Sequence, residues 1–204
     1  MLRMVELVLV FSILMIPGCV APQAEPVQES DEDANGSDEI TIPERLNLIA
    51  DTAGRDIDRS PRMDILEDAG GYNTMILWVS SGCSGCHDWT EMIAEEMRNG
   101  NISNETRIVT VHRYPSFESR QEVIDVYATE NTSTESLWPV LLPVKKQPAI
   151  DVDKDNETEF DYATAFESPP TPSFTIIDGE GKTIWKNKEY WYDEYVLEEA
   201  LEYL

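Results

Sequence analysis

Two cysteines close together are the residues in this sequence best suited to chemistry. Cys83 and Cys86 stand in the segment GCSGCH, between an apolar run that begins at Met75 and a helical pattern that reaches Met97. Two intervening residues at a strand-to-helix turn place both sulfurs on the first helical turn, within reach of a small-ring disulfide. The unpaired N–H groups and positive dipole end of the helix favour the thiolate of Cys83 over its thiol. A partly exposed thiolate is what disulfide exchange requires.

The same residues fit other kinds of site. With His87 as the last residue, the motif C-x-x-C-H is also the attachment pattern of c-type haem. Two cysteines and a histidine are also three ligands for a metal ion, and a structural disulfide without turnover is the simplest alternative. The strand-turn-helix setting favours a redox dithiol. His87 then either tunes the thiols or is an ordinary exposed helix residue.

The overall charge narrows the range of partners. The chain has 204 residues, of which 40 are acidic and 15 basic, for a formal net charge of -25. A nucleic acid is excluded as a partner because its phosphates would be repelled, and a basic patch for anionic lipids is equally unfavoured. The length suits one domain with a proper core.

The N-terminal 41 residues read as targeting and tethering segments. Residues 1–18 resemble an export signal, with an apolar run too short to span a bilayer comfortably. Gly18-Cys19 after this run resembles a lipobox, although Pro17 departs from the small residue usual there. Cys19 is therefore the expected lipidation site, and the alternative is an uncleaved N-terminal signal anchor with an incidental cysteine. Residues 19–41 are acidic and poor in apolar side chains, which predicts a disordered tether. These features place residues 42–204 outside the cytoplasm, anchored to the cell membrane.

An extracytoplasmic location gives meaning to the Asn-x-Ser/Thr sequons, which are acceptor sites for N-glycosylation. The chain carries five of them, at Asn35, Asn101, Asn104, Asn131 and Asn156.

The segments around the cysteines show clear periodicities. Ser60-Pro61 predicts the start of a short helix that Gly70-Gly71 ends. Residues 75–80 predict a strand, and residues 106–111 alternate as a second strand. The helix between them buries a stripe of apolar side chains, formed by Trp89, Met92, Ile93 and Met97.

The second half of the chain is less regular. Ser116 is a candidate cap for a helix that runs to about Thr129, with Phe117, Ile124 and Tyr127 facing inward. Residues 131–167 predict an irregular insertion that contains a solvated loop at 151–161 and a helical turn at 160–166. Strands then follow at 173–178 and 183–186, joined by the turn at 179–182, and a helix ends the chain at 191–204.

This order, with TPSFTIIDGEGKTIW downstream of CSGC, resembles the thioredoxin-like superfamily, and within it the membrane-tethered thiol-disulfide oxidoreductases of the TlpA type. The resemblance covers residues 60–204, less closely across 131–167. It implies an α/β fold with a central mixed β-sheet flanked by helices. The insertion lies between the CxxC half and the Thr-Pro/hairpin half.

The resemblance also implies roles for individual residues. Cys83 attacks a protein partner and Cys86 resolves the mixed disulfide. Thr171 and Pro172 shape a groove for an extended peptide of the partner, with a cis bond between them. The expected partner is a protein dithiol or disulfide. No metal and no dissociable cofactor are expected, because the electrons reside in the two sulfurs.

The sequence departs from that family at three places. Leu77 stands where a buried acid often relays protons, Gly82 replaces an aromatic residue, and Ser84-Gly85 lacks a proline. A copper site of Cys83, Cys86 and His112 ranks low, because copper-handling relatives space their cysteines more widely. His112 itself is expected at the surface, where its strand ends. Haem c domains are mostly helical, which weighs against the haem alternative.

Overall fold

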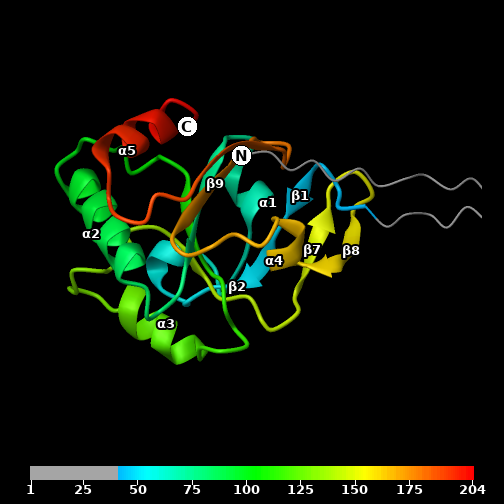
Figure 1. Ribbon diagram of the computed structural model, residues 1–204, viewed down its shortest axis with the longest axis horizontal. Helices are drawn as coiled ribbons and strands as arrows, with labels where there is room; N and C mark the ends of the chain where they lie inside the picture. The colour runs from blue at the N-terminus through cyan, green and yellow to red at the C-terminus, as the bar shows by residue number, and fades with distance from the viewer. Residues whose placement is uncertain (1–40) are drawn as a thin grey trace, which may run out of the picture. The chain divides into compact units, whose positions relative to one another are not determined.

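A five-stranded mixed sheet lies at the centre of residues 41–204. These are the residues that this computed structural model describes (Figure 1). The predicted signal peptide at 1–18, Cys19 and Asn35 lie outside the described residues. From one edge to the other the strands are β10 (Thr183–Asn187), β9 (Ser173–Ile177), β4 (Thr74–Val79), β5 (Ile108–His112) and β6 (Val140–Leu141). β4, β5 and β6 run parallel, whereas β9 is antiparallel to β4 and β10 is antiparallel to β9.

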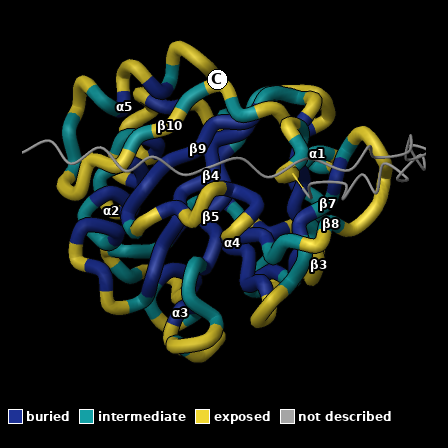
Figure 2. Tube along the Cα trace, turned by 45° about the vertical axis from the view of Figure 1, so that its right-hand side comes forward, coloured by how far each residue is buried: buried dark blue, intermediate teal, exposed yellow. Residues whose placement is uncertain are grey.

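The middle strand, β4, is apolar along most of its length because both of its faces are covered. All six of its residues are buried. Leu77 and Val79 point into one hydrophobic cluster, while Ile76 and Trp78 point into the other. A strand buried on both sides loses the alternation of polar and apolar residues that a half-exposed strand shows. Figure 2 shows β4, β5 and β9 as the buried centre of the domain.

Three helices cover the first face of the sheet. They are α2 (Ser84–Arg98), α3 (Arg120–Tyr127) and α5 (Glu194–Leu201). Trp89 and Ile93 of α2, Tyr127 of α3 and Leu197 of α5 share one cluster with Leu77 of the sheet. The amphipathic stripe predicted for α2 is thus confirmed, except that Met92 is only half-buried.

Shorter elements cover the second face. They are β1 (Leu46–Asn47), β2 (Ile49–Asp51), β3 (Arg62–Asp64), α1 (Ile65–Ala69), β7 (Pro148–Asp151), β8 (Asn156–Asp161) and α4 (Tyr162–Ala165). β7 and β8 form a hairpin that pairs with β1, and β2 pairs with β3. Within residues 41–204, no helix is both long enough and apolar enough to cross a lipid bilayer.

Several predicted elements are confirmed, including the strands around residues 75–80, 106–111 and 183–186 and the helical turn near 160–166. Other predictions are wrong. The cap of α1 is Asp64, which accepts a hydrogen bond from the backbone N–H of Glu67, whereas Ser60 precedes β3. The charged stretch 151–161 is largely the β7–β8 hairpin rather than a loop.

The predicted start of α3 is also wrong. Its cap is Ser119, which forms a reciprocal capping box with Glu122, so the helix begins three residues later than expected. Phe117 therefore lies in the preceding loop and is 88% exposed instead of inward-facing. The C-terminal helix is similarly shorter than predicted, because Asp193 caps it.

Candidate active site

Cys83 and Cys86 form a disulfide at the start of α2, immediately after the carboxyl end of β4. Their Cα atoms are 5.2 Å apart. Cys83 is the N-cap of the helix, and its sulfur accepts a hydrogen bond from the backbone N–H of Cys86 at 3.2 Å. Cys83 is 8% exposed and Cys86 is 0% exposed. Cys83 therefore lies closer to the surface than Cys86, and the helix N-terminus favours negative charge on its sulfur.

The two serines before the disulfide are held by side chains from three other segments. The Tyr127 hydroxyl donates to the carbonyl of Ser80 at 2.7 Å. Glu118 accepts from the backbone N–H of Ser81 at 3.0 Å, and Nε2 of His87 bonds the carbonyl of Ser81 at 2.8 Å. Buried backbone groups are costly when left unpaired, so these bonds fix the path of the chain into the cysteines.

Glu118 also pairs with His112, a buried histidine at the end of β5. Nε2 of His112 is 3.1 Å from Oε2 of Glu118. Burial lowers the pKa of His112, and the nearby charges of Glu118 and Glu122 only partly oppose that shift. The imidazole is therefore neutral at pH 7, and its Nε2–H donates to Glu118. The prediction of a surface location for His112 is wrong, since this side chain is 1% exposed at the end of β5.

The loop between β10 and α5 packs directly on the CxxC motif. Trp89 donates its indole N–H to the carbonyl of Glu189 at 2.9 Å, and Asp88 accepts from the backbone N–H of Tyr192 at 2.8 Å. These bonds bring the carbonyl oxygen and ring of Tyr190 against Gly85, where any Cβ would overlap that oxygen. This contact leaves no room for a side chain at position 85.

Thr171 and Pro172 precede β9 at the same edge of the sheet as the cysteines. The bond between them is cis, as the resemblance implies. β9 is antiparallel to β4, with Ser173 opposite Trp78, so the start of β9 lies beside the end of β4. Pro172 is buried and Thr171 is half-buried. Their role in binding a partner peptide stays a prediction, as do the roles of His87 and the two cysteines in turnover.

Two residues of this site, Glu118 and Tyr190, were not predicted from the sequence, and His112 was considered only as a low-ranked copper ligand. Glu118 and His112 belong to segments that carry no motif, although the apolar strand leading to His112 is a signal that this histidine is buried. Tyr190 stands just before the predicted last helix, in a stretch without a motif. Thus a carboxylate does reach the turn before the disulfide, but it comes from Glu118 and not from the position of Leu77.

The other predicted sites stand apart from this centre. Across residues 41–204, no three His, Cys, Asp or Glu side chains gather as a metal site, so His112 does not join the cysteines in a ligand set. The described sequon asparagines are all exposed; they are Asn101, Asn104, Asn131 and Asn156. Their glycosylation stays a prediction.

Comparison with solved structures addresses the fold. The domain superposes on a putative protein disulfide isomerase from Bacteroides thetaiotaomicron with a TM-score of 0.51 and 15% identity, covering 81% of this chain and 91% of the other. The thioredoxin domain of a thiol-disulfide oxidoreductase from Bacteroides vulgatus gives 0.50 and 15%, covering 79% and 95%. The chain has a thioredoxin-like fold.

A third thioredoxin-like structure, an exposed lipoprotein thioredoxin from Streptococcus pneumoniae, gives a TM-score of 0.50 and 16% identity and covers 76% of this chain and 98% of the other. No family model and no curated protein matches the chain in sequence. At these identities the likeness concerns the arrangement of the backbone. The case for chemistry therefore depends on the residues of this chain.

Proposed function

We propose that this protein is a thiol-disulfide oxidoreductase that exchanges a dithiol and a disulfide with a protein partner. One observation carries the proposal: the disulfide of Cys83 and Cys86 stands at the N-cap of a long helix, with Cys83 closer to the surface (8% exposed) than Cys86 (0% exposed). This arrangement provides an attacking sulfur and a protected resolving sulfur. The thioredoxin-like fold supports the same conclusion.

In the direction that reduces the partner, the thiolate of Cys83 attacks one sulfur of the partner's disulfide. A bond between Cys83 and the partner forms, and the partner's other sulfur leaves as a thiolate. Cys86, after losing its proton, attacks the sulfur of Cys83 and releases the second partner thiolate. The partner gains two electrons and two protons, and the Cys83–Cys86 disulfide is restored. Oxidation of a partner dithiol is the reverse sequence.

The surrounding residues position this chemistry. Tyr127 and Glu118 hold the turn that carries Cys83, and His87 completes that set of hydrogen bonds. The negative charge of Glu118 beside the turn opposes a thiolate at Cys83, whereas the N-terminus of α2 favours it. Thr171 and Pro172 border the cysteines and supply backbone for an extended partner segment. No dissociable cofactor enters the reaction, because the two sulfurs store both electrons.

We propose further that the domain works outside the cytoplasm and is held at the membrane through a lipid on Cys19. The support is the signal-like segment 1–18 followed by Gly18-Cys19 and an acidic tether. Metabolic labelling with a radioactive fatty acid tests this directly. The wild-type chain should carry label and sediment with membranes, whereas the Cys19→Ser chain should carry none. Equal labelling of the two chains would contradict the assignment.

The activity itself is tested by a redox titration of the full chain in a Cys19→Ser background, followed by thiol alkylation and intact mass. We expect a reversible gain of two alkyl groups with one defined midpoint. A midpoint of about −270 mV would indicate a reductase, and a midpoint of about −120 mV would indicate an oxidase. Cysteines that remain oxidised at every native potential would contradict the proposal.

The same mass measurement distinguishes the two alternatives. A covalent haem on CSGCH would add its mass and a visible absorption band, and the protein would be an electron carrier. A stable disulfide, together with failure of a Cys86→Ser chain to form mixed disulfides in cells, would indicate an interaction module without turnover. The strands on both sides of the motif weigh against the haem alternative, because haem c domains are mostly helical.

A further inference from the structure

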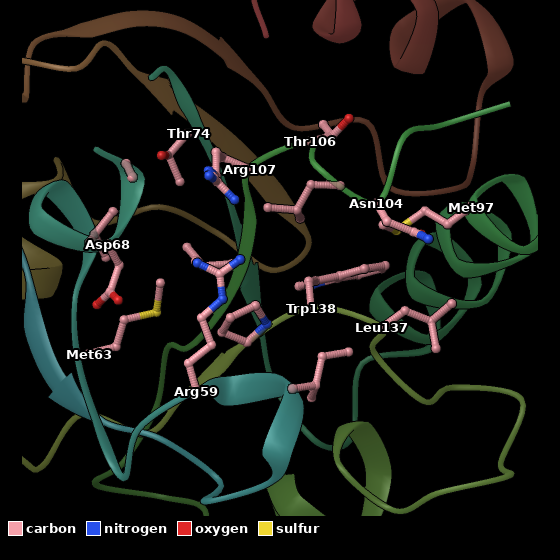
Figure 3. A pocket seen from close by; sticks show the side chains of 16 residues that line it. Arg59, Met63, Asp68, Thr74, Met97, Asn104, Thr106, Arg107, Leu137 and Trp138 are labelled. Carbon is pink, nitrogen blue, oxygen red and sulfur yellow. The ribbon is translucent and has the colours of Figure 1, made fainter. Parts of the chain in front are cut away.

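A pocket lies at the opposite end of β4 from the disulfide. Thr74, the first residue of β4, lines it, whereas the cysteines follow the last residue of the strand. The other walls come from the 3-10 helix at Asp56–Asp58 with the turn after it, β3 with α1, the end of α2, residues 104–109 leading into β5, and the loop before β6. Figure 3 shows these side chains converging on one space.

Two arginines enter this pocket without an acidic partner. Arg59 and Arg107 both line it, and neither forms an ion pair with any residue between positions 41 and 204. This is notable in a chain where acidic residues outnumber basic ones by 40 to 15. The Nε atom of Arg107 is also buried and bonds no acceptor within the described residues. A guanidinium N–H removed from water needs an acceptor, which an anion in the pocket would provide.

The hydroxyl of Thr74 is an independent sign of a missing ligand. Thr74 is 2% exposed, and within residues 41–204 its Oγ1 has no hydrogen-bond partner. Buried hydroxyls are rarely left unpaired in native proteins. Thr74 thus adds a short, neutral donor to the two cationic ones, on the same side of the pocket as both arginines in Figure 3.

The remaining walls define the rest of the ligand. Across the pocket from the arginines lie Met97, Leu137 and Trp138, a largely apolar surface (Figure 3). Asp68 lines the polar side and accepts a hydrogen bond from the backbone N–H of Asp64. Its negative charge disfavours anions of high charge, such as sulfate or phosphate, more than it disfavours a monoanion.

We propose that this pocket binds a small organic carboxylate that carries a short apolar group. The planar guanidinium groups match a carboxylate with paired N–H donors, and Thr74 adds a further donor. The apolar group lies against Met97, Leu137 and Trp138. The pocket is separate from the disulfide, so a test of ligand binding does not depend on the redox activity.

The pocket carries its own spectroscopic reporters. Met63 and Met97 line it. Met92 lies on α2, as Met97 does, but does not line the pocket. The full chain, labelled at the methionine methyl groups, is titrated with sodium isovalerate and followed by NMR. We expect saturable shifts of the Met63 and Met97 signals, with Met92 unmoved. Absence of any shift up to saturating isovalerate would overturn the proposal.

Three further probes separate charge from shape. Acetate keeps the carboxylate without the apolar group and should bind more weakly than isovalerate. Isovaleramide keeps the shape without the charge and should not shift the two signals. Sulfate tests a general anion site. If isovaleramide or sulfate binds as tightly as isovalerate, the assigned ligand class is wrong.

Substitutions localise the effect. Arg59→Gln and Arg107→Gln should each weaken isovalerate binding about tenfold, the loss expected for a hydrogen bond to a charged group. Arg107→Lys keeps the charge but not the fork and should bind with intermediate affinity. The matched control is Arg62→Gln, an exposed arginine of β3 outside the pocket. Unchanged positions of the methionine signals outside the pocket, such as Met92, show that the fold of each variant is intact, and unchanged binding in both glutamine variants would overturn the proposal.

Discussion

The polar groups at the two ends of β4 differ in whether they have hydrogen-bond partners. At the carboxyl end, the backbone groups of Ser80 and Ser81 are bonded by Tyr127, Glu118 and His87. At the amino end, Thr74 presents a buried hydroxyl with no partner in residues 41–204. Arg107, in the segment that leads into β5, likewise keeps a buried N–H that no described residue accepts.

This contrast distinguishes two kinds of site. Disulfide exchange needs sulfurs held in one geometry, and the protein supplies every contact for that from its own side chains. A ligand pocket needs donors that remain available until the ligand arrives. The paired end should therefore lose function or stability when a contact is removed, whereas changes at the unpaired end should alter ligand binding alone.

The largest effect is expected at the paired end from Cys83→Ser, which should abolish exchange with a protein disulfide. Serine is a good N-cap, so α2 should persist and the loss should reflect the missing sulfur. Cys86→Ser should instead accumulate mixed disulfides, because the resolving thiol is gone. Reduction of a disulfide-containing protein, with products resolved on non-reducing gels, measures both. Residual turnover in Cys83→Ser would show that Cys86 can attack alone.

The next effect concerns the loop that covers the motif. Gly85→Ala should destabilise the domain by about 1–3 kcal/mol, because the added Cβ overlaps the carbonyl oxygen of Tyr190. Gly82→Ala is the matched control, since a Cβ there meets no atom within 4 Å. Chemical denaturation of both variants measures the difference. Equal stabilities would mean that the loop yields without cost.

Removal of one hydrogen bond to the turn before Cys83 should lower the stability by less. Tyr127→Phe leaves the carbonyl of Ser80 without its donor and should lower the free energy of unfolding by about 1 kcal/mol. Tyr195→Phe, on an 80% exposed tyrosine, serves as the control and should be neutral. If the two variants unfold alike, the hydroxyl of Tyr127 is replaced by water at no cost.

Glu118→Gln should change the redox balance more than the stability. The amide oxygen still accepts from Ser81, but the negative charge that opposes a thiolate is gone. The reduced form gains stability, so the midpoint should rise by up to about 30 mV, equivalent to about 1.4 kcal/mol. Glu91→Gln, on the exposed face of α2, should leave it unchanged. A fall in the midpoint would contradict this electrostatic role.

The smallest effect is a pH dependence due to His112. Burial lowers the pKa of His112 in the folded protein, whereas in the unfolded chain this histidine has a pKa of about 6.5. Below that pH the unfolded state binds a proton that the folded state does not, so stability falls as the pH drops from 7 to 5. His112→Gln should show a smaller fall in melting temperature over this range. His87→Gln is the control, and an identical fall in all three chains would exclude His112 as the cause.

Much of this fold could be predicted from local sequence. The apolar run of β4, the apolar stripe on α2 and the turn between β9 and β10 are each recognised from residues that are close together in the sequence. The β7–β8 hairpin was not predicted because its charged residues resemble a loop. Its place is set by pairing with β1, where Leu46 lies opposite Asp151, about a hundred residues away in sequence.

The sequence by itself determined the reactive pair. A spacing of two residues between Cys83 and Cys86, at a junction of strand and helix, is local information that favours a disulfide at a helix N-terminus. Only the tertiary structure decided what surrounds them: Glu118 beneath the turn, Tyr190 over Gly85, and Arg59 beside Arg107 in a distant pocket. These residues come from separate segments, and their proximity depends on how the helices and strands pack around the sheet, which no local pattern records.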